Sequence, residues 1–422
     1  MVAVILDKII EIEKTLYRSW KTPPFVNDIS LMTGISGLPI FYCMLYNIDE
    51  NPIYVEKIEE IVNKIFEQLN SNSSNNRIGS TFSSGIAGIG YVLNLIEENG
   101  VLKDIDLTES LNVIDEILLD TVDHFVSYVD ELEHKYKIEQ IDFLHGVLGI
   151  AYYLLNRLTN GIDEKKVIQV FEKISEIVID DCELAIDMIN VEEILQDHKK
   201  TNLGLAHGHT SYILIFSKFL EKFPNNEKAK EVVSKSAKLI MSFKNDDESN
   251  ICVFPSIAVN KKTAFYKVHL GWCYGDQAIA YGLYKAGEVL KDSYYINESI
   301  EIAKLTFKRN SVSTALLNSD DYDAGFCHGT SSVAFFHKKW YKIAKNEMFE
   351  DLYNKFIFET LIAAKHEQGM AGFLKHDGKG DLVKAIGMLD GIAGIGVVLI
   401  DYYNYYLKNE VNLNWQSMYL LN

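Results

Sequence analysis

The chain has 422 residues, of which 48% are hydrophobic and 24% charged, a composition typical of a folded protein and not of a disordered one. Its formal net charge of −18 argues against a nucleic-acid partner, because phosphate binding needs a basic face. Five cysteines in so long a chain do not indicate a disulfide framework. For any cysteine that has a function, we therefore favour metal binding or thiol chemistry.

The first twenty residues carry Asp7, Glu11 and Glu13 within an apolar pattern, which is not the pattern of a secretory signal. No run of 18 apolar residues occurs anywhere in the sequence. We therefore expect a cytoplasmic protein.

A short glycine motif recurs along the chain. The strong copies are GISG at 34–37, GIAG at 85–88, GVLG at 146–149 and GIAG at 391–394, and weaker copies begin at Gly208, Gly275 and Gly329. The steps between first glycines are 51, 61, 62, 67, 54 and 62 residues. Self-similarity at a steady spacing is the signature of a repeat architecture, here with a unit of about sixty residues.

Each strong copy leads into a segment that is apolar nearly all round, such as 86–95 or 147–155, which predicts a helix buried on every side. Between the copies lie amphipathic helices, for example over 55–69. Small residues at both ends of the motif would let the buried helices approach closely. The pattern predicts an all-α fold, an α/α toroid of seven helical hairpins closed into one domain over residues 1–422. An open helical solenoid is the alternative, but solenoid repeats are usually shorter.

One segment departs from the helical pattern. Residues 251–254 and 263–268 are rich in β-branched and aromatic side chains. We expect a small β insertion near 250–270.

The residues just before each first glycine should meet at one end of the fold, because the buried helices of a toroid run parallel. In chain order these residues are Thr33, Ser84, His145, His207, Tyr274, His328 and Asp390. Cys273 and Cys327 stand one position earlier in their copies.

Cys273, Cys327 and His328 together would make a three-ligand zinc site with one open position, as expected of catalytic zinc centres. Adjacent ligands such as Cys327 and His328 can face one ion at the bend into a helix, where the helix terminus also favours thiolate. The alternative is that both cysteines are small core residues and His328 merely caps a helix. The shared position in the repeat favours the metal.

The motifs that carry these residues resemble those of the lanthionine synthetase C-like family. They are GWCYGD at 271–276, GFCHG at 325–329, LGLAHG at 203–208 and DFLHGVLG at 142–149. The resemblance covers essentially the whole chain and implies an α/α toroid that forms lanthipeptide rings. It implies a precursor peptide dehydrated by a partner dehydratase, with an export transporter as a further partner and membrane association through that complex.

The resemblance also assigns roles. Cys273, Cys327 and His328 would bind one Zn²⁺ per chain, and His207 and Asp142 would share the acid–base work. Tyr274 matches a further site residue. Bacterial members commonly have an arginine four residues before the first metal cysteine, where this chain has His269. Either His269 takes over part of the contact with the enolate, or that contact is absent. His145 and His209 are extra histidines, for which we favour a role as satisfied polar groups at helix ends.

The expected reaction is the addition of a peptide cysteine thiol to dehydroalanine or dehydrobutyrine. Two thiolates and one imidazole leave a zinc ion without net charge, so a bound substrate sulfur stays nucleophilic while its pKa falls. Attack creates an enolate that an imidazolium such as His207 can protonate. Asp142 would orient that imidazole or hold the proton. Asp142 alone would be an ordinary capping carboxylate.

Three other functions fit parts of the pattern. A zinc enzyme that alkylates thiols, resembling the prenyltransferase β-subunits, would need basic residues for a diphosphate, and the motifs contain no such cluster. A glycosidase would need two opposed carboxylates and would leave zinc unexplained. A family member that binds thiols or dehydrated peptides without cyclising them is the non-enzymatic alternative.

Overall fold

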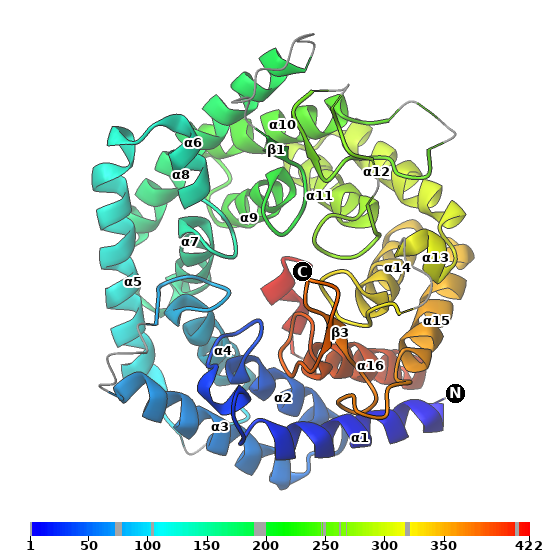
Figure 1. Cartoon of the computed structure of the whole chain (residues 1–422). Helices are drawn as coiled ribbons and strands as arrows, with labels where there is room; N and C mark the ends of the chain where they lie inside the picture. Colours follow the sequence, from blue (N-terminus) through cyan, green and yellow to red (C-terminus); the bar gives the residue numbers. More distant parts are fainter. Residues whose placement is uncertain are drawn as a thin grey trace. The chain divides into compact units, whose positions relative to one another are not determined.

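The first glycine of each motif copy directly precedes a helical segment, as the sequence predicts. The computed structural model describes residues 2–71, 78–102, 105–189, 200–245, 247, 250–260, 263–266, 268–316, 321–409 and 413–422. The glycine-led helices are α2 (Leu38–Asp49), α4 (Ile86–Asn99), α7 (Val147–Asn156), α9 (His209–Lys222), α11 (Asp276–Leu290), α14 (Thr330–Ala344) and α16 (Ile392–Leu407), labelled in Figure 1.

Amphipathic helices alternate with the glycine-led ones. They are α1 (Val2–Ser19), α3 (Pro52–Asn70), α5 (Thr108–Tyr128), α8 (Glu164–Met188), α10 (Glu227–Ser242), α12 (Ser293–Leu305) and α15 (Glu347–Ile362). Two short helices, α6 (His134–Gln140) and α13 (Val312–Ala315), lie in connections.

The two kinds of helix start differently. Asn51, Asp163, Asn226 and Asp292 cap α3, α8, α10 and α12 by accepting hydrogen bonds from first-turn N–H groups. The helices α4, α7, α9, α11 and α16 have glycine at that position and no side-chain cap. Sequence pattern and capping therefore mark the same division.

The burial of the helices matches their predicted character. Every residue from Val147 to Leu155 of α7 is buried. In α3 only one stripe is buried, consisting of Ile58, Ile61, Val62 and Ile65. The glycine-led helices therefore form the core, and the amphipathic helices cover it.

The chain divides into two compact units. Unit 1 comprises Met1–Leu119, Asp321–Phe335 and Asn354–Asn422, and unit 2 comprises Asp120–Asp320 and Phe336–Tyr353. In unit 1, α2 packs against both α16 and α4, while α1 covers α16 and α3 covers α2 (Figure 1). In unit 2, α9 packs against α11, while α10 contacts both, α12 covers α11 and α8 packs on α7 and α10. Each unit thus has a layer of glycine-led helices under a layer of amphipathic ones.

The glycines are needed because the chain turns back tightly before each helix. A Cβ atom on Gly34, Gly85 or Gly208 would lie only 2.2, 2.3 and 2.1 Å from the carbonyl oxygen six residues earlier. The second glycine behaves likewise, since a Cβ on Gly88 would lie 2.1 Å from the oxygen of Phe82. Close helix approach, the reason we inferred from sequence, is therefore secondary to this contact within one copy.

The strands among the described residues are short and form two antiparallel pairs. Strand β1 (Thr201–Asn202) pairs with β2 (Ile257–Ala258), and β3 (Lys375–His376) pairs with β4 (Leu382–Val383). The β insertion predicted near 250–270 is therefore present only as β2. Residues 251–254 and the described residues of 263–268 are not strands, so that part of the prediction is wrong. Residues 261, 262 and 267 lie outside the described part of the chain.

All five cysteines are free. Four of them are buried, and Cys327 is partly exposed. Among the described residues, none of the helices combines the length and the apolar character needed to cross a membrane.

Candidate active site

The predicted site residues lie in one type of turn. The N–H of the first glycine donates to the carbonyl four residues earlier at Gly85, Gly146, Gly208, Gly275 and Gly329, over 2.9 to 3.1 Å. The residue before each glycine is therefore held inside a closed turn at the start of a helix. This turn is the bend that the sequence requires for adjacent functional side chains such as Cys327 and His328.

Backbone hydrogen bonds connect neighbouring turns. In unit 2, the carbonyl oxygen of Cys273 accepts from the N–H groups of Leu205 and Ala206, at 2.8 and 3.2 Å. In unit 1, the carbonyl of Leu389 accepts from Phe326 and Cys327, at 2.7 and 3.0 Å. These bonds hold neighbouring turns together. The positions of the side chains that precede each glycine are therefore determined by hydrogen-bonded backbone.

His207 and Asp142 form a direct pair in unit 2. Nδ1 of His207 lies 2.7 Å from Oδ2 of Asp142, and the other carboxylate oxygen accepts from the N–H of His145 at 2.7 Å. Both side chains keep some solvent contact, with 32% and 17% of their surfaces exposed. The carboxylate can therefore hold Nδ1–H of the imidazole and leave Nε2 free to exchange a proton.

Aromatic rings surround this pair. The His145 ring stacks on that of His207, with ring centroids 5.6 Å apart and planes inclined by 19°. The ring of Tyr274 lies 6.4 Å from that of His207. Tyr274 comes directly after Cys273, so the turn that carries this predicted ligand also places a tyrosine ring near the imidazole.

Cys273 has an imidazole neighbour in its own unit. Nε2 of His269 lies 3.6 Å from Sγ of Cys273, while Nδ1 of His269 accepts from the N–H of Gly271 at 3.1 Å. The thiol is nearly buried, with 5% of the residue exposed. His269 therefore contacts the predicted metal ligand, a contact that the sequence does not reveal.

A buried ion pair holds the turn of Cys273. Asp276, at the start of α11, accepts from the N–H groups of Val253 and Phe254 and from Nη1 of Arg309 at 3.0 Å. Arg309 also donates to the carbonyls of Val268, Thr314 and Ala315. Neither side chain is exposed by more than 1%. The pair ties together three segments around α11, and its only sequence signal is the position of Asp276 directly after the glycine.

Cys327 and His328 lie in unit 1 beside two carboxylates. Burial lowers the pKa of His328, but a hydrogen bond to Cys327 and the negative charges of Cys327, Asp323 and Asp390 outweigh it and raise the pKa to about 9. Nε2 of His328 lies 3.7 Å from Oδ2 of Asp323. Without a metal, the imidazole of His328 therefore favours its protonated form, and a metal bound to it would displace that proton.

His209 belongs to a separate buried network. Its Nε2 lies 3.2 Å from Oδ2 of Asp181, and its Nδ1 lies 3.2 Å from Oγ of Ser236. Oδ1 of Asp181 lies 3.1 Å from Nε2 of His134. This arrangement supports the interpretation of His209 as a satisfied polar group at a helix end.

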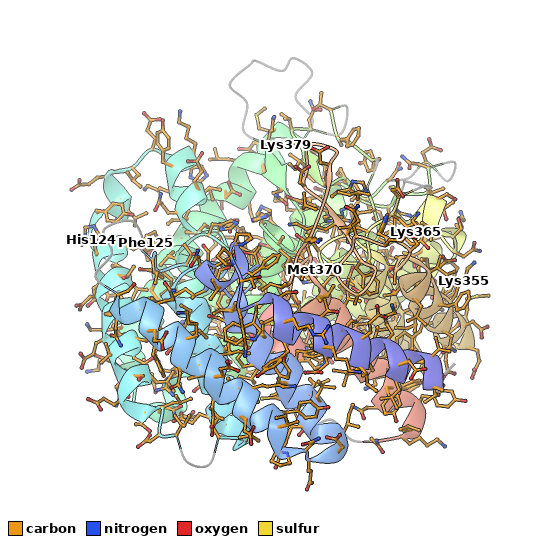
Figure 2. The ribbon with its side chains drawn as sticks, turned by 60° about the horizontal axis from the view of Figure 1, so that its bottom comes forward. His124, Phe125, Lys355, Lys365, Met370 and Lys379 are labelled. Atoms are coloured by element: carbon orange, nitrogen blue, oxygen red, sulfur yellow. The ribbon has the colours of Figure 1, made fainter. Side chains whose placement is uncertain are left out.

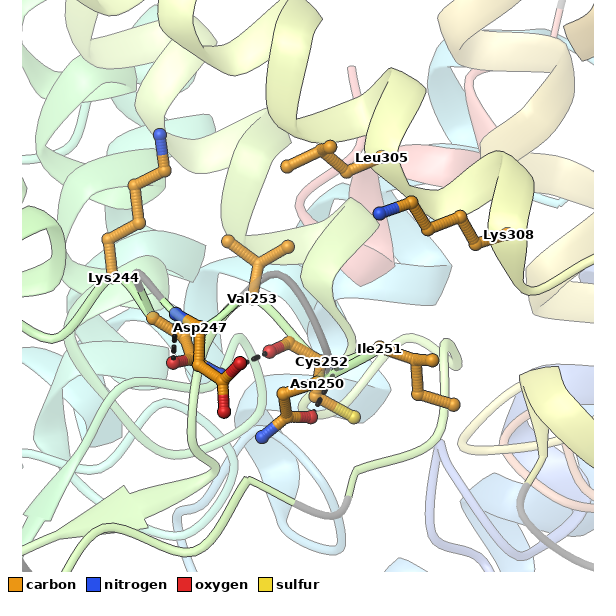
Figure 3. Close-up of a pocket in the computed structure, with 9 residues that line it drawn as sticks. Lys244, Asp247, Asn250, Ile251, Cys252, Val253, Leu305 and Lys308 are labelled. Carbon is orange, nitrogen blue, oxygen red and sulfur yellow. Dashed lines mark hydrogen bonds between the residues drawn. The ribbon is translucent and has the colours of Figure 1, made fainter.

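A cavity of about 360 Å³ lies elsewhere in unit 2 (Figure 3). Its lining consists of Lys244, Asn245, Asp247, Asn250, Ile251, Cys252, Val253, Leu305 and Lys308. None of the residues predicted to bind metal or transfer protons lines it, so we place it outside the candidate site.

Residues 26–420 match the family model described as lanthionine synthetase C-like protein. The nisin biosynthesis protein NisC of Lactococcus lactis subsp. lactis is 22% identical over 370 residues, covering 82% of each chain. A solved structure described as nisin cyclase aligns with a TM-score of 0.69 at 18% identity, covering 97% of this chain and 96% of its own. Because nisin cyclase is an α/α toroid, this likeness confirms the predicted fold class.

Proposed function

Because the chain belongs to the lanthionine synthetase C-like family, we propose that it is a lanthipeptide cyclase that forms thioether rings in a dehydrated peptide. The names of its relatives, a nisin biosynthesis protein and a nisin cyclase, support this activity. The observation that carries the proposal is the turn that the copies share. Cys273 and Cys327 lie two residues before the first glycine, and His207 and His328 lie one residue before it. Asp142 begins the turn that ends at Gly146.

The residues present suit a zinc ion. Cys273, Cys327 and His328 are, within the described part of the chain, the group of side chains whose ligand atoms could hold one metal ion. Two sulfurs and one imidazole match the ligand preference of zinc and leave one position open, as in catalytic sites. Zinc bound there would lower the pKa of a substrate thiol while keeping its sulfur nucleophilic.

The reaction moves one proton from sulfur to carbon. The substrate thiol releases its proton to solvent, its sulfur bonds to the β-carbon of the dehydrated residue, and the electrons of the double bond move toward the amide oxygen. A proton then reaches the α-carbon, so peptide mass does not change. Nε2 of His207 would deliver that proton, because Asp142 holds Nδ1 at 2.7 Å and leaves Nε2 for the exchange.

The substrate in this proposal is a precursor peptide whose serines and threonines a partner dehydratase has already dehydrated. An export transporter would take up the product, and the complex would act in the cytoplasm at the membrane. Five free cysteines suit such a reducing compartment. Co-purification with a tagged dehydratase from the producing cell tests the association.

We propose further that residues 1–422 act as one domain built from seven repeats. Calorimetry of the metal-loaded protein should then give one cooperative unfolding transition. Two resolved transitions, one for each compact unit, would contradict this.

The activity is tested with a dehydrated, cysteine-containing peptide and zinc. Ring closure should protect the peptide cysteines from iodoacetamide without changing the peptide mass. Continued labelling at the uncatalysed rate, despite measurable peptide binding, would identify a non-cyclising family member instead. A zinc enzyme that alkylates thiols with another donor would leave this peptide unchanged but would increase its mass once that donor is added.

A further inference from the structure

A hairpin in unit 1 lies against the turn that carries Cys327 and His328. It consists of β3 and β4, with Lys375 opposite Val383 and His376 opposite Leu382. Its tip carries Lys379, labelled in Figure 2. The connection between α15 and α16 therefore has a defined structure next to the candidate site, although none of the sequence motifs includes it.

Asp323 holds one side of this hairpin. Its Oδ2 accepts from the N–H of His376 at 3.3 Å, and its Oδ1 accepts from the N–H of Gly325 at 2.6 Å. The same carboxylate lies 3.7 Å from Nε2 of His328. A single buried side chain thus connects strand β3 to the Cys–His turn.

Asp390 holds the other side. Nζ of Lys375 donates to Oδ2 of Asp390 at 3.3 Å. Asp390 follows Leu389, whose carbonyl accepts from the N–H of Cys327 at 3.0 Å, and a Cβ added to Gly325 would lie 2.9 Å from the Cα of Asp390. The ammonium of Lys375 is therefore bound to Asp390, the residue next to Leu389, and Leu389 is hydrogen-bonded to the backbone of Cys327.

The ion pair between Lys375 and Asp390 does not use all the polar atoms of the two side chains. Lys375 keeps 24% of its side chain exposed and Asp390 keeps 15%. Oδ1 of Asp390 is buried and has no hydrogen-bond partner within the described residues. The ammonium of Lys375 has three donors and bonds to only one oxygen of Asp390, so it can also donate to an acceptor on a substrate.

We propose that Lys375 binds the amide oxygen of the dehydrated residue and stabilises the negative charge that develops on it during thiol addition. This inference rests on the proposed cyclase function. The bond from sulfur to the β-carbon pushes the electron pair of the double bond onto that oxygen, and an ammonium placed beforehand stabilises it most strongly in the transition state. Asp390 positions the ammonium, and the hairpin carries it.

The test compares ring-closure kinetics of four variants at saturating zinc. Lys375→Gln should lower kcat roughly 100-fold, the loss typical for one oxyanion donor, with little change in KM. Lys375→Arg should recover part of that loss because it restores a cationic donor. Lys379→Gln removes a lysine at the tip of the same hairpin and should react as fast as the wild type. Zinc content and melting temperature should be unchanged in all three.

The double variant Lys375→Gln/Asp390→Asn separates catalysis from charge pairing. If Lys375 only neutralises Asp390, removing both charges should restore the rate, which would overturn the inference. A slow double variant with full zinc content supports it. Lys375→Gln cyclising at the wild-type rate overturns this inference alone, whereas a wild-type protein that closes no ring overturns the proposed function with it.

Discussion

Nδ1 of His207 lies 2.7 Å from Oδ2 of Asp142, a residue 65 positions earlier in the chain. The N–H of His145 holds the other carboxylate oxygen, so the carboxylate cannot rotate away from the ring. From this geometry we propose that Asp142 sets the imidazole tautomer and that His207 exchanges the proton in the proposed reaction.

Replacing His207 with alanine should slow ring closure by about 10²–10⁴-fold, the range for loss of a general acid. Asp142→Asn should cost less, because the imidazole stays in place while its tautomer and its charge are no longer favoured. The double variant should be no slower than His207→Ala alone, since the two residues act as one unit. Rates of loss of iodoacetamide-reactive thiols measure all three.

His124→Gln is the matched control for these variants, because His124 is an exposed histidine on α5, labelled in Figure 2. It should cyclise at the wild-type rate. Multiplicative losses in the double variant, equal to the product of the single effects, would contradict a joint role for His207 and Asp142.

Metal content should follow the three proposed ligands. We expect one zinc per chain, with a sharp drop in Cys273→Ala, Cys327→Ala and His328→Ala while the helical circular dichroism is retained, because each change removes one of only three protein ligands. A chelator should abolish ring closure by the wild type, and added zinc should restore it. Elemental analysis and a zinc dye give the stoichiometry.

Cys252→Ala is the control for these ligand variants. Cys252 is a buried cysteine of unit 2 whose thiol donates to the carbonyl of Val268 at 3.5 Å. Its replacement should leave zinc content unchanged. Full zinc occupancy in Cys273→Ala would remove Cys273 from the ligand set, whatever the activity of that variant.

The sequence predicts the repeat and the positions of its functional residues because both lie in the turn before a helix. Glycine is required where a Cβ atom would clash with the carbonyl oxygen six residues earlier, so these glycines recur at a regular spacing in the sequence. A residue such as His207 is then recognised by its position directly before such a glycine. The roles expected for His207 and Asp142 came from the resemblance of their motifs to the family, and the structure places the two side chains 2.7 Å apart.

Contacts that depend on distant segments could not be predicted in this way. Arg309 reaches Asp276 from 33 residues away, and Lys375 belongs to no repeated motif. The position of β2 depends on β1, a strand more than fifty residues earlier, so local β propensity at 251–254 was a poor guide. Packing between segments decided these features.

Stability should fall in acid because of His337 on α14. Complete burial lowers the pKa of His337 to about 3, and its Nδ1 lies 3.1 Å from Nε2 of Gln277. The unfolded chain takes up a proton below pH 6.5 while the folded chain does not, so stability is lost as pH falls from 6.5 toward 3. Between pH 7 and pH 5 this group should cost about 2 kcal/mol.

The measurement compares urea unfolding of the wild type and His337→Gln at both pH values. Glutamine keeps a hydrogen-bond acceptor for Gln277 but does not titrate. The variant should therefore lose about 2 kcal/mol less than the wild type on acidification, independent of its stability at pH 7. An equal pH dependence in both proteins would show that His337 is not kept neutral by the fold.

The glycine motif itself can be tested by adding one methyl group. A Cβ on Gly88 would lie 2.1 Å from the carbonyl oxygen of Phe82 and 2.9 Å from Cβ of Leu31, so the backbone of the turn must move. Alanine favours the helix over glycine by about 1 kcal/mol, but overpacking of this kind typically costs about 1–3 kcal/mol. Because the contact is with a rigid carbonyl, we expect the cost for Gly88→Ala to lie at the upper end of that range.

Gly79→Ala is the matched control, because a Cβ there meets nothing within 4 Å. Chemical denaturation should show a net loss for Gly88→Ala and a change within about 0.5 kcal/mol for Gly79→Ala. If Gly88→Ala were as stable as the wild type, the repeated glycine would need another explanation than the turn that positions the site.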